Sequence, residues 1–141
     1  MTVGIETRII AALNAHLVAL AIVPIAAISW PNRTFTPPST VYLRVNILPT
    51  RVDALELSTR GPNEYEGLYQ VSVFWPVDRG QTAPLEMAAA IAAHFKRGTR
   101  LFQEDIPVRI DTPPLIAAPV QEDVRFHIPV TITYRAFVLN P

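Results

Sequence analysis

The sequence predicts an α+β domain with a mainly antiparallel sheet and two helices packed on one face of that sheet. Three segments alternate apolar and polar residues with the period of a β-strand, at 41–48, 65–75 and 124–135. Two other segments, near the N-terminus and in the middle of the chain, repeat apolar residues at helical spacing. No linker or internal repeat divides the 141 residues, so we expect one domain over residues 1–141.

The first expected element is an amphipathic helix over residues 3–20. Thr2 is placed to cap it, and Glu6 lies near the positive end of the helix dipole. Pro24 cannot continue a helix, so the helix ends before it, and residues 25–30 are expected to form a short strand. The apolar stripe of the helix consists of Ile5, Ile9, Leu13, Leu17 and Leu20.

Strands and loops alternate in the next part of the chain. A polar loop with two adjacent prolines, residues 32–40, precedes the strand at 41–48. A weaker alternation at 55–58 predicts a second strand, and residues 60–64 then form a hairpin-type loop. The strand at 65–75 follows that loop directly.

The second helix has the clearest boundaries. A turn over residues 76–80 precedes it, Thr82 is expected to cap it, and Pro84 lies in its first turn. Gly98 marks its end, because glycine readily adopts the conformation that terminates a helix. Its many alanines keep it slim, so it can pack closely on a sheet. Its apolar line consists of Met87, Ile91 and Phe95.

The last third of the chain returns to strands, at 106–110 and 124–135, with a short apolar piece at 115–120 between them. Pro129 removes one hydrogen-bond donor from the final strand, which favours an edge position or a bulge. The predicted core contains Ile9, Leu13, Val45, Val71, Val73, Ile91, Phe95, Ile128 and Val130.

Composition limits the classes of function. Hydrophobic residues make up 50% of the chain and charged residues 17%, below the ~25% of an average domain, so part of the apolar surface is expected in a subunit interface. The formal net charge is zero, which gives no overall field to attract nucleic acid or anionic membranes. The apolar run at 17–28 is shorter than the ~20 residues that cross a bilayer. There is no cysteine, which excludes disulfides and thiolate metal sites.

No residue pattern predicts an enzyme, a metal site or a cofactor site. His16, His94 and His127 lie far apart in sequence, and none has a second ligand three or four residues away, so we interpret all three as structural. The acidic pairs at 104–105 and 122–123 precede strands and are expected to be solvated. The chain has no phosphate-binding glycine loop and no activated serine motif.

The loops instead indicate a protein that binds other proteins. Proline lowers the entropy that a loop loses when it is ordered against a partner. The loop at 60–66 combines a cation, a Gly-Pro turn, an amide and an aromatic ring, and the loop at 31–40 adds further candidates. The predicted partner-contact residues are Arg60, Asn63, Glu64, Tyr65, Phe35 and Arg33.

Several segments together resemble a family of small tailed-phage and prophage proteins, similar in fold to the tail terminator proteins of siphophages. The resemblance covers most of the chain, most clearly residues 40–100, and its motifs are structural rather than catalytic. It is carried by Trp30-Pro31-Asn32, Tyr42-Leu43-Arg44-Val45, the stretch Glu66–Val73, the turn Pro76-Val77-Asp78-Arg79-Gly80, and the alanine-rich helix ending with Phe95 and Gly98.

The resemblance implies a non-enzymatic virion assembly protein that forms a hexameric ring on the tail tube, stops its polymerisation and offers a surface for head joining. Its partners would be further copies of itself, the tube protein and a head-completion protein, with no membrane and no sequence-specific nucleic acid. It would act in the virion tail, after assembly in the host cytoplasm. The alternatives are a head–tail connector or neck component and, from another class, a small-ligand-binding domain or enzyme with a site between sheet and helix.

Overall fold

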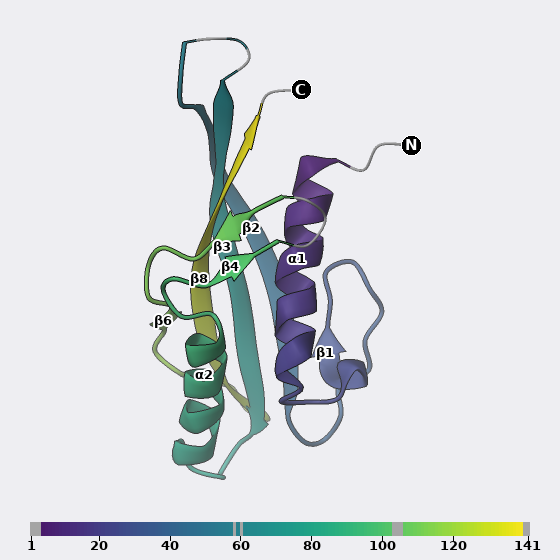
Figure 1. The fold of residues 1–141 in the computed structure, drawn as a ribbon. Coiled ribbons are helices and arrows are strands. Elements are labelled where there is room, and N and C mark those ends of the chain that lie inside the picture. Colours follow the sequence, from purple (N-terminus) through teal and green to yellow (C-terminus); the bar gives the residue numbers. More distant parts are fainter. Residues whose placement is uncertain (1–3, 58, 60, 103–105, 140–141) are drawn as a thin grey trace.

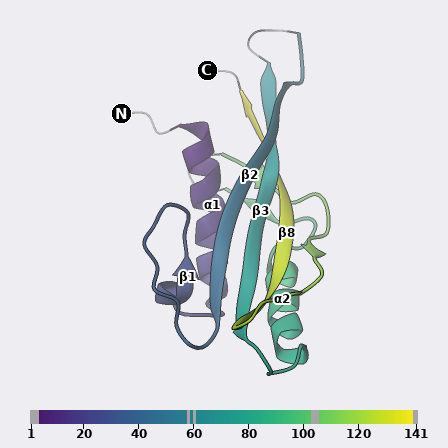
Figure 2. The ribbon, with the colours of Figure 1, turned by 180° about the vertical axis from the view of Figure 1, so that it is seen from behind.

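Three long antiparallel strands form the centre of the molecule: β2 (Tyr42–Ala54), β3 (Pro62–Pro76) and β8 (Arg125–Leu139). The structure is a computed structural model that describes residues 4–57, 59, 61–102 and 106–139. Two helices, α1 (Ile5–Leu20) and α2 (Thr82–His94), lie behind the sheet when the strands face the viewer (Figure 2). The predicted α+β fold with both helices on one face is confirmed.

Short elements complete the sheet at both sides. The strand order is β1-β2-β3-β8-β5-β4, and β6 and β7 also pair with β8. Among the strands of the described residues, only β1 runs parallel to its neighbour. The short elements are the 3-10 helix η1 (Ile25–Ala27) and the strands β1 (Ile28–Ser29), β4 (Arg100–Leu101), β5 (Val108–Arg109), β6 (Leu115–Ile116) and β7 (Val120–Gln121).

The core fills the space between the helices and the sheet. The register places Val45 opposite Val71, and Val71 opposite Val130, so one row of valines crosses all three long strands. Each fully buried side chain of this size contributes about 1.5–3 kcal/mol of transfer free energy. All nine predicted core residues are buried: Ile9, Leu13, Val45, Val71, Val73, Ile91, Phe95, Ile128 and Val130.

The helix ends differ from the sequence-based expectation. Gly4 is the N-cap of α1, and the expected cap, Thr2, lies outside the described residues. Thr82 is the first residue of α2 rather than its cap. That helix ends at His94, before Gly98, because Phe95 leaves helical geometry (φ −107°, ψ 34°) with its ring fully buried.

The strand expected at 55–58 is wrong. Pairing between β2 and β3 shifts between Pro49 and Arg51, which leaves Thr50 as an extra residue in β2. Beyond this bulge the ladder continues to Ala54, so β2 is longer than predicted and Leu55 already enters the turn. Two other expected strands are shorter in the structure. The segment 25–30 forms η1 followed by the two-residue strand β1, and the segment 106–110 contains only the two-residue strand β5.

Pro129 lies in an interior strand, which corrects the expected edge position. It faces Ser72 of β3, while its carbonyl oxygen accepts the Ala117 N–H on the opposite side. In an antiparallel strand the nitrogen and the carbonyl oxygen of one residue point to the same side, so the Pro129 nitrogen points away from β3. On that side, β6 pairs with Val130 and Thr131 and β7 pairs with Phe126 and His127, and the missing N–H of Pro129 falls between these two pairings. The ladder with β3 therefore loses no hydrogen bond.

The sheet extends past the helices at one end. Figure 1 shows β2 and β3 continuing beyond α1 to a turn, beside the last part of β8. We call the described part of residues 50–65 the projecting hairpin. The opposite end of the sheet carries the turn into α2 and the β7–β8 turn.

Candidate functional site

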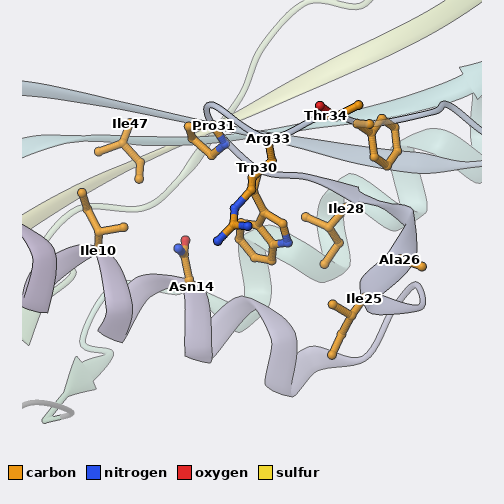
Figure 3. A pocket seen from close by; sticks show the side chains of 11 residues that line it. Ile10, Asn14, Ile25, Ala26, Ile28, Trp30, Pro31, Arg33, Thr34 and Ile47 are labelled. Carbon is orange, nitrogen blue, oxygen red and sulfur yellow. The ribbon is translucent and has the colours of Figure 1, made fainter.

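A groove of about 610 Å³ lies between α1, the segment after it and β2 (Figure 3). We call it the α1–β2 groove. Ala21 (φ 54°) ends α1 in the left-handed conformation, and β1 then pairs with Leu43 and Arg44. Asn32 (φ 55°), of a residue type that tolerates this conformation, turns the chain back. The apolar walls comprise Ile10, Ile25, Ile28, Trp30, Phe35 and Ile47.

Two polar side chains, Asn14 and Arg33, enter this apolar groove. Asn14 Oδ1 accepts a hydrogen bond of 2.7 Å from the hydroxyl of Tyr69, which is fully buried. Burial raises the pKa of that Tyr69 hydroxyl. The Arg33 side chain lies beside Trp30 and points towards α1 (Figure 3). Because Arg33 makes no ion pair with any described residue, its charge is available to a partner.

The projecting hairpin is the second candidate surface, and it exposes large apolar side chains. Val52 is 55% exposed, Leu55 is 44% exposed and Leu57 is fully exposed. Leu48, before the bulge in β2, is also 48% exposed. Exposed aliphatic side chains gathered on one projection are typical of a surface that another protein covers.

Charged side chains line the other face of the projecting hairpin. Arg51 Nε lies 2.7 Å from Asp53 Oδ2 within β2. Arg135 Nε lies 3.5 Å from Glu64 Oε1 and 3.7 Å from Glu66 Oε2, joining β8 to β3. These pairs are partly solvated, so each contributes at most about 1 kcal/mol to stability.

The predicted contact residues fall in two separate places. Arg33 and Phe35 line the α1–β2 groove. Asn63, Glu64 and Tyr65 lie in β3 rather than in a loop, paired with β2 and β8, and Glu64 is already bound to Arg135. Arg60, the sixth predicted residue, lies outside the described residues.

Sequence reasoning missed the exposed leucines of the projecting hairpin. Leu55 and Leu57 flank Glu56 with strand periodicity, and this pattern predicts a strand. Their position between two long strands and next to a Gly-Pro pair is the signal that indicates a turn. Trp30, part of the Trp30-Pro31-Asn32 segment that carries the resemblance, lines the groove.

The three histidines have partners within the fold. His16 and His94 stack on each other, and His127 stacks on Phe74 with ring centroids 4.6 Å apart. His127 Nδ1 also lies 3.8 Å from Glu122 Oε1. Across the described ranges, no group of three or more histidine, aspartate or glutamate side chains could hold a metal ion.

Aromatic and arginine side chains cover the sheet face opposite the helices, at the end where β2 and β8 begin. Tyr42 stacks on Phe74 at 4.7 Å, and Arg44 lies over the Phe74 ring at 4.6 Å. Arg125 lies over Tyr42 and donates hydrogen bonds to the carbonyl oxygens of Pro38 and Thr40. These contacts hold the loop before β2 against the start of β8.

Comparison with known proteins identifies the family. The family of the phage tail terminator protein matches residues 8–134, from α1 to β8. One solved structure, of a protein whose name states no function, is 26% identical, with a TM-score of 0.75; the similarity covers 94% of this chain and 96% of that one. No curated protein matches the sequence.

Further, no helix among the described residues has the length and apolar character needed to cross a bilayer. The fold consists of a sheet centred on three long strands with helices on one face, and the family match spans nearly all of it. Because the matching family consists of phage tail proteins, this chain is a component of a virion tail. The chain belongs to the phage tail terminator family.

Proposed function

We propose that this chain caps the tail tube: copies of it form a ring on the end of the tube, stop its polymerisation and offer a surface for head joining. Membership of the tail terminator family supports a structural role in the tail. The observation that carries the finer proposal is the projecting hairpin, which extends beyond the helices and exposes Leu55 and Leu57 (Figure 1).

The projecting hairpin has the properties of a contact element for the tube protein. Its two strands are hydrogen-bonded up to the pair Ala54–Asn63, so the backbone is ordered before a partner arrives. Binding to a partner then costs mainly the conformational entropy of the side chains, and burial of the exposed leucines contributes favourable free energy. A tube end that buries these side chains is therefore a suitable partner.

The free edge of β2 supports termination rather than extension of a polymer. Among the described strands, only β1 pairs with this edge, at Leu43 and Arg44. Beyond them the edge carries Pro49, the bulge at Thr50 and a charged Arg51. Proline, bulges and charges are devices that prevent another strand from adding to an edge. Contacts to further subunits are accordingly made by side chains rather than by continuing the sheet.

The proposed ring is a hexamer that forms on a tube end, with the isolated chain monomeric or weakly associated. The low proportion of charged residues, 17%, fits surface that is covered on assembly. The tube protein and a head-completion protein are the proposed partners. Assembly takes place in the host cytoplasm, before the virion is complete.

A tube-length assay tests this function. Purified tube protein is polymerised with and without the chain, and tube lengths and end structures are measured by electron microscopy. We expect the wild-type chain to shorten the tubes and to leave a ring at their ends. Leu57→Ser should abolish both effects, whereas Phe102→Ser, which changes an exposed aromatic residue outside the hairpin, should not. Unchanged tube lengths with the wild-type chain would overturn the proposal.

The residues chosen from sequence are tested in the same assay. A variant with Arg60→Ala and Tyr65→Ala should impair capping if the loop at 60–66 contacts the tube. Circular dichroism checks that the fold is intact. Normal capping by this variant would remove that loop as a contact segment and leave the exposed leucines as the candidates.

A further inference from the structure

We propose that the α1–β2 groove belongs to the tube-binding surface and receives an apolar segment of the tube protein, with a carboxylate of that segment bound between Arg33 and Asn14. This contact rests on the proposed function as a tube cap. It extends the contact of the projecting hairpin to a second surface and specifies the chemistry of the tube segment that binds there.

The groove continues as far as the projecting hairpin. Ile10 lines three adjoining cavities: the α1–β2 groove, a cavity of about 540 Å³ beside Leu48 and a small one of about 40 Å³ beside Val52. Ile47 is shared by the first two cavities, and Pro49 by the last two. We call the three cavities together the extended groove. Because it reaches Val52 of the hairpin, a partner that covers the hairpin also faces the groove.

Exposed apolar side chains follow the same line. A stable protein interface buries about 800 Å² on each partner, supplied by roughly 20–30 residues. The projecting hairpin has fewer residues than that, so a contact of this size includes a neighbouring surface, and the extended groove is the apolar surface that adjoins it. Five of the nine large apolar side chains that are exposed in the described part of the chain lie along the extended groove or on the hairpin: Ile25, Leu48, Val52, Leu55 and Leu57.

Three polar side chains inside the groove offer hydrogen-bond donors. Arg33 has a guanidinium and Trp30 has an indole N–H, and neither group can accept a hydrogen bond. Asn14 Oδ1 already accepts from the Tyr69 hydroxyl at 2.7 Å, which leaves the Asn14 amide nitrogen as a donor. Figure 3 shows the Arg33 side chain extending across the groove towards α1, the helix that carries Asn14. An occupant of the groove must therefore supply acceptors.

A carboxylate is the group that matches these donors. It accepts two parallel hydrogen bonds from a guanidinium and has lone pairs left for an amide N–H. Arg33 has no ion pair with any described residue, so the carboxylate also neutralises its charge. Glu6, at the hairpin end of the extended groove, likewise has no ion pair within the described ranges. The tube segment is accordingly acidic only towards Arg33.

The tube segment binds through its side chains. The edge of β2 that borders the extended groove carries Pro49 and the bulge at Thr50, which disfavour pairing with a further strand. An amphipathic helix lays one apolar face into a groove without pairing its backbone, so it suits this site better than an extended strand.

Site-directed photo-cross-linking tests the contact, because the chain has no cysteine and a thiol label attaches only at an introduced one. Ile25→Cys and Leu48→Cys, at exposed positions of the extended groove, are coupled to a benzophenone maleimide and irradiated on tube ends. We expect adducts with the tube protein, located by mass spectrometry in one stretch that contains an aspartate or glutamate. Phe102→Cys, exposed but outside both surfaces, is the control and should give no tube adduct.

Charge reversal tests the role of Arg33. Arg33→Glu should raise the concentration of chain required for half-maximal tube capping roughly tenfold, since a repulsive charge replaces a charge-assisted hydrogen-bonded pair. Arg97→Glu, which reverses an exposed cation outside the groove, should leave this concentration unchanged. Circular dichroism identifies any variant that fails to fold. Equal capping by Arg33→Glu and the wild type would refute the carboxylate contact.

The possible results separate this contact from the proposed function. If the wild-type chain caps tubes but the groove labels give no tube adduct, the groove contact is wrong and the capping function stands. If the labels join two copies of this chain, the groove lies between subunits and does not bind the tube. If tube lengths stay unchanged while the labels still reach the tube protein, the capping function fails and the groove contact stands.

Discussion

His16 and His94 stack face to face, with ring centroids 3.8 Å apart and ring planes within 9° of parallel. The Nε2 of His16 lies 2.7 Å from the carbonyl oxygen of His94, and the Nε2 of His94 lies 2.6 Å from that of His16. Since a carbonyl only accepts, both Nε2 atoms carry the proton and donate it. Two residues 78 positions apart thus join α1 to α2 by a reciprocal pair of hydrogen bonds.

This pair should make stability fall in mild acid. Burial lowers the pKa of His16 below 6.5. The hydrogen bond to the His94 carbonyl oxygen raises this pKa, and the nearby His94 ring lowers it, but burial has the largest effect. The unfolded chain therefore binds more protons as the pH falls below 6.5, and the free energy of unfolding decreases until the folded pKa is passed. Melting temperatures measured from about pH 8 to pH 5 should show this loss. His16→Gln should reduce the pH dependence, and His127→Gln should retain it.

Gly67 should not tolerate a side chain. It lies opposite Tyr134 in the ladder, and a methyl group there would lie 2.6 Å from Tyr134 Cζ and 2.8 Å from Cε2. Because the Tyr134 ring is buried, it has little room to move, and Gly67→Ala should lower the free energy of unfolding by about 1–3 kcal/mol. Urea denaturation measures the change. Gly4→Ala is the control, since no atom lies within 4 Å of a methyl group there. An equal stability of the Gly67→Ala variant and the wild type would contradict this account.

The Asn14–Tyr69 hydrogen bond should respond unequally to removal of its two partners. Asn14→Ala leaves the fully buried Tyr69 hydroxyl without its acceptor, which should cost about 1–3 kcal/mol. Tyr69→Phe leaves only Asn14, which lines the groove and can bond to water, and it should cost about 0.5–1.5 kcal/mol. Chemical denaturation of both single variants and the double variant gives the coupling energy. A Tyr69→Phe variant less stable than Asn14→Ala would refute the assignment.

Arg125 should hold the loop before β2 in place. Its two terminal nitrogens donate to the carbonyl oxygens of Thr40 and Pro38, and the guanidinium lies 5.0 Å from the centre of the Tyr42 ring. Lysine cannot bridge two acceptors in this fixed fork, so Arg125→Lys should release the loop without unfolding the protein. Limited trypsin digestion should then cut faster after Arg33. Arg109→Lys, which alters an arginine stacked on Phe137, serves as the control and should leave that rate unchanged.

The sequence by itself determined the layers and the core. Period-two alternation at Val45, Val71 and Val130 and the helical spacing of Ile9 and Leu13 require one apolar face per element, whatever the neighbours are. Burial of those faces against each other leads to helices on one side of a sheet. The predicted boundaries failed at Phe95, where α2 ends before Gly98, and in β2, whose ladder continues past the bulge at Thr50 to Ala54.

Only the tertiary structure decided which surfaces exist. The α1–β2 groove combines Ile10, Arg33 and Ile47 from three segments, and no local pattern specifies their distance. The stacked histidines depend in the same way on the packing of α1 against α2. The two predicted contact residues of the loop at 31–40 reached the groove, while Asn63, Glu64 and Tyr65 entered the sheet, because the register with β8 extends the hairpin ladder to Pro62. Local patterns record which face of an element is apolar, and the distances between elements arise only when those faces pack together.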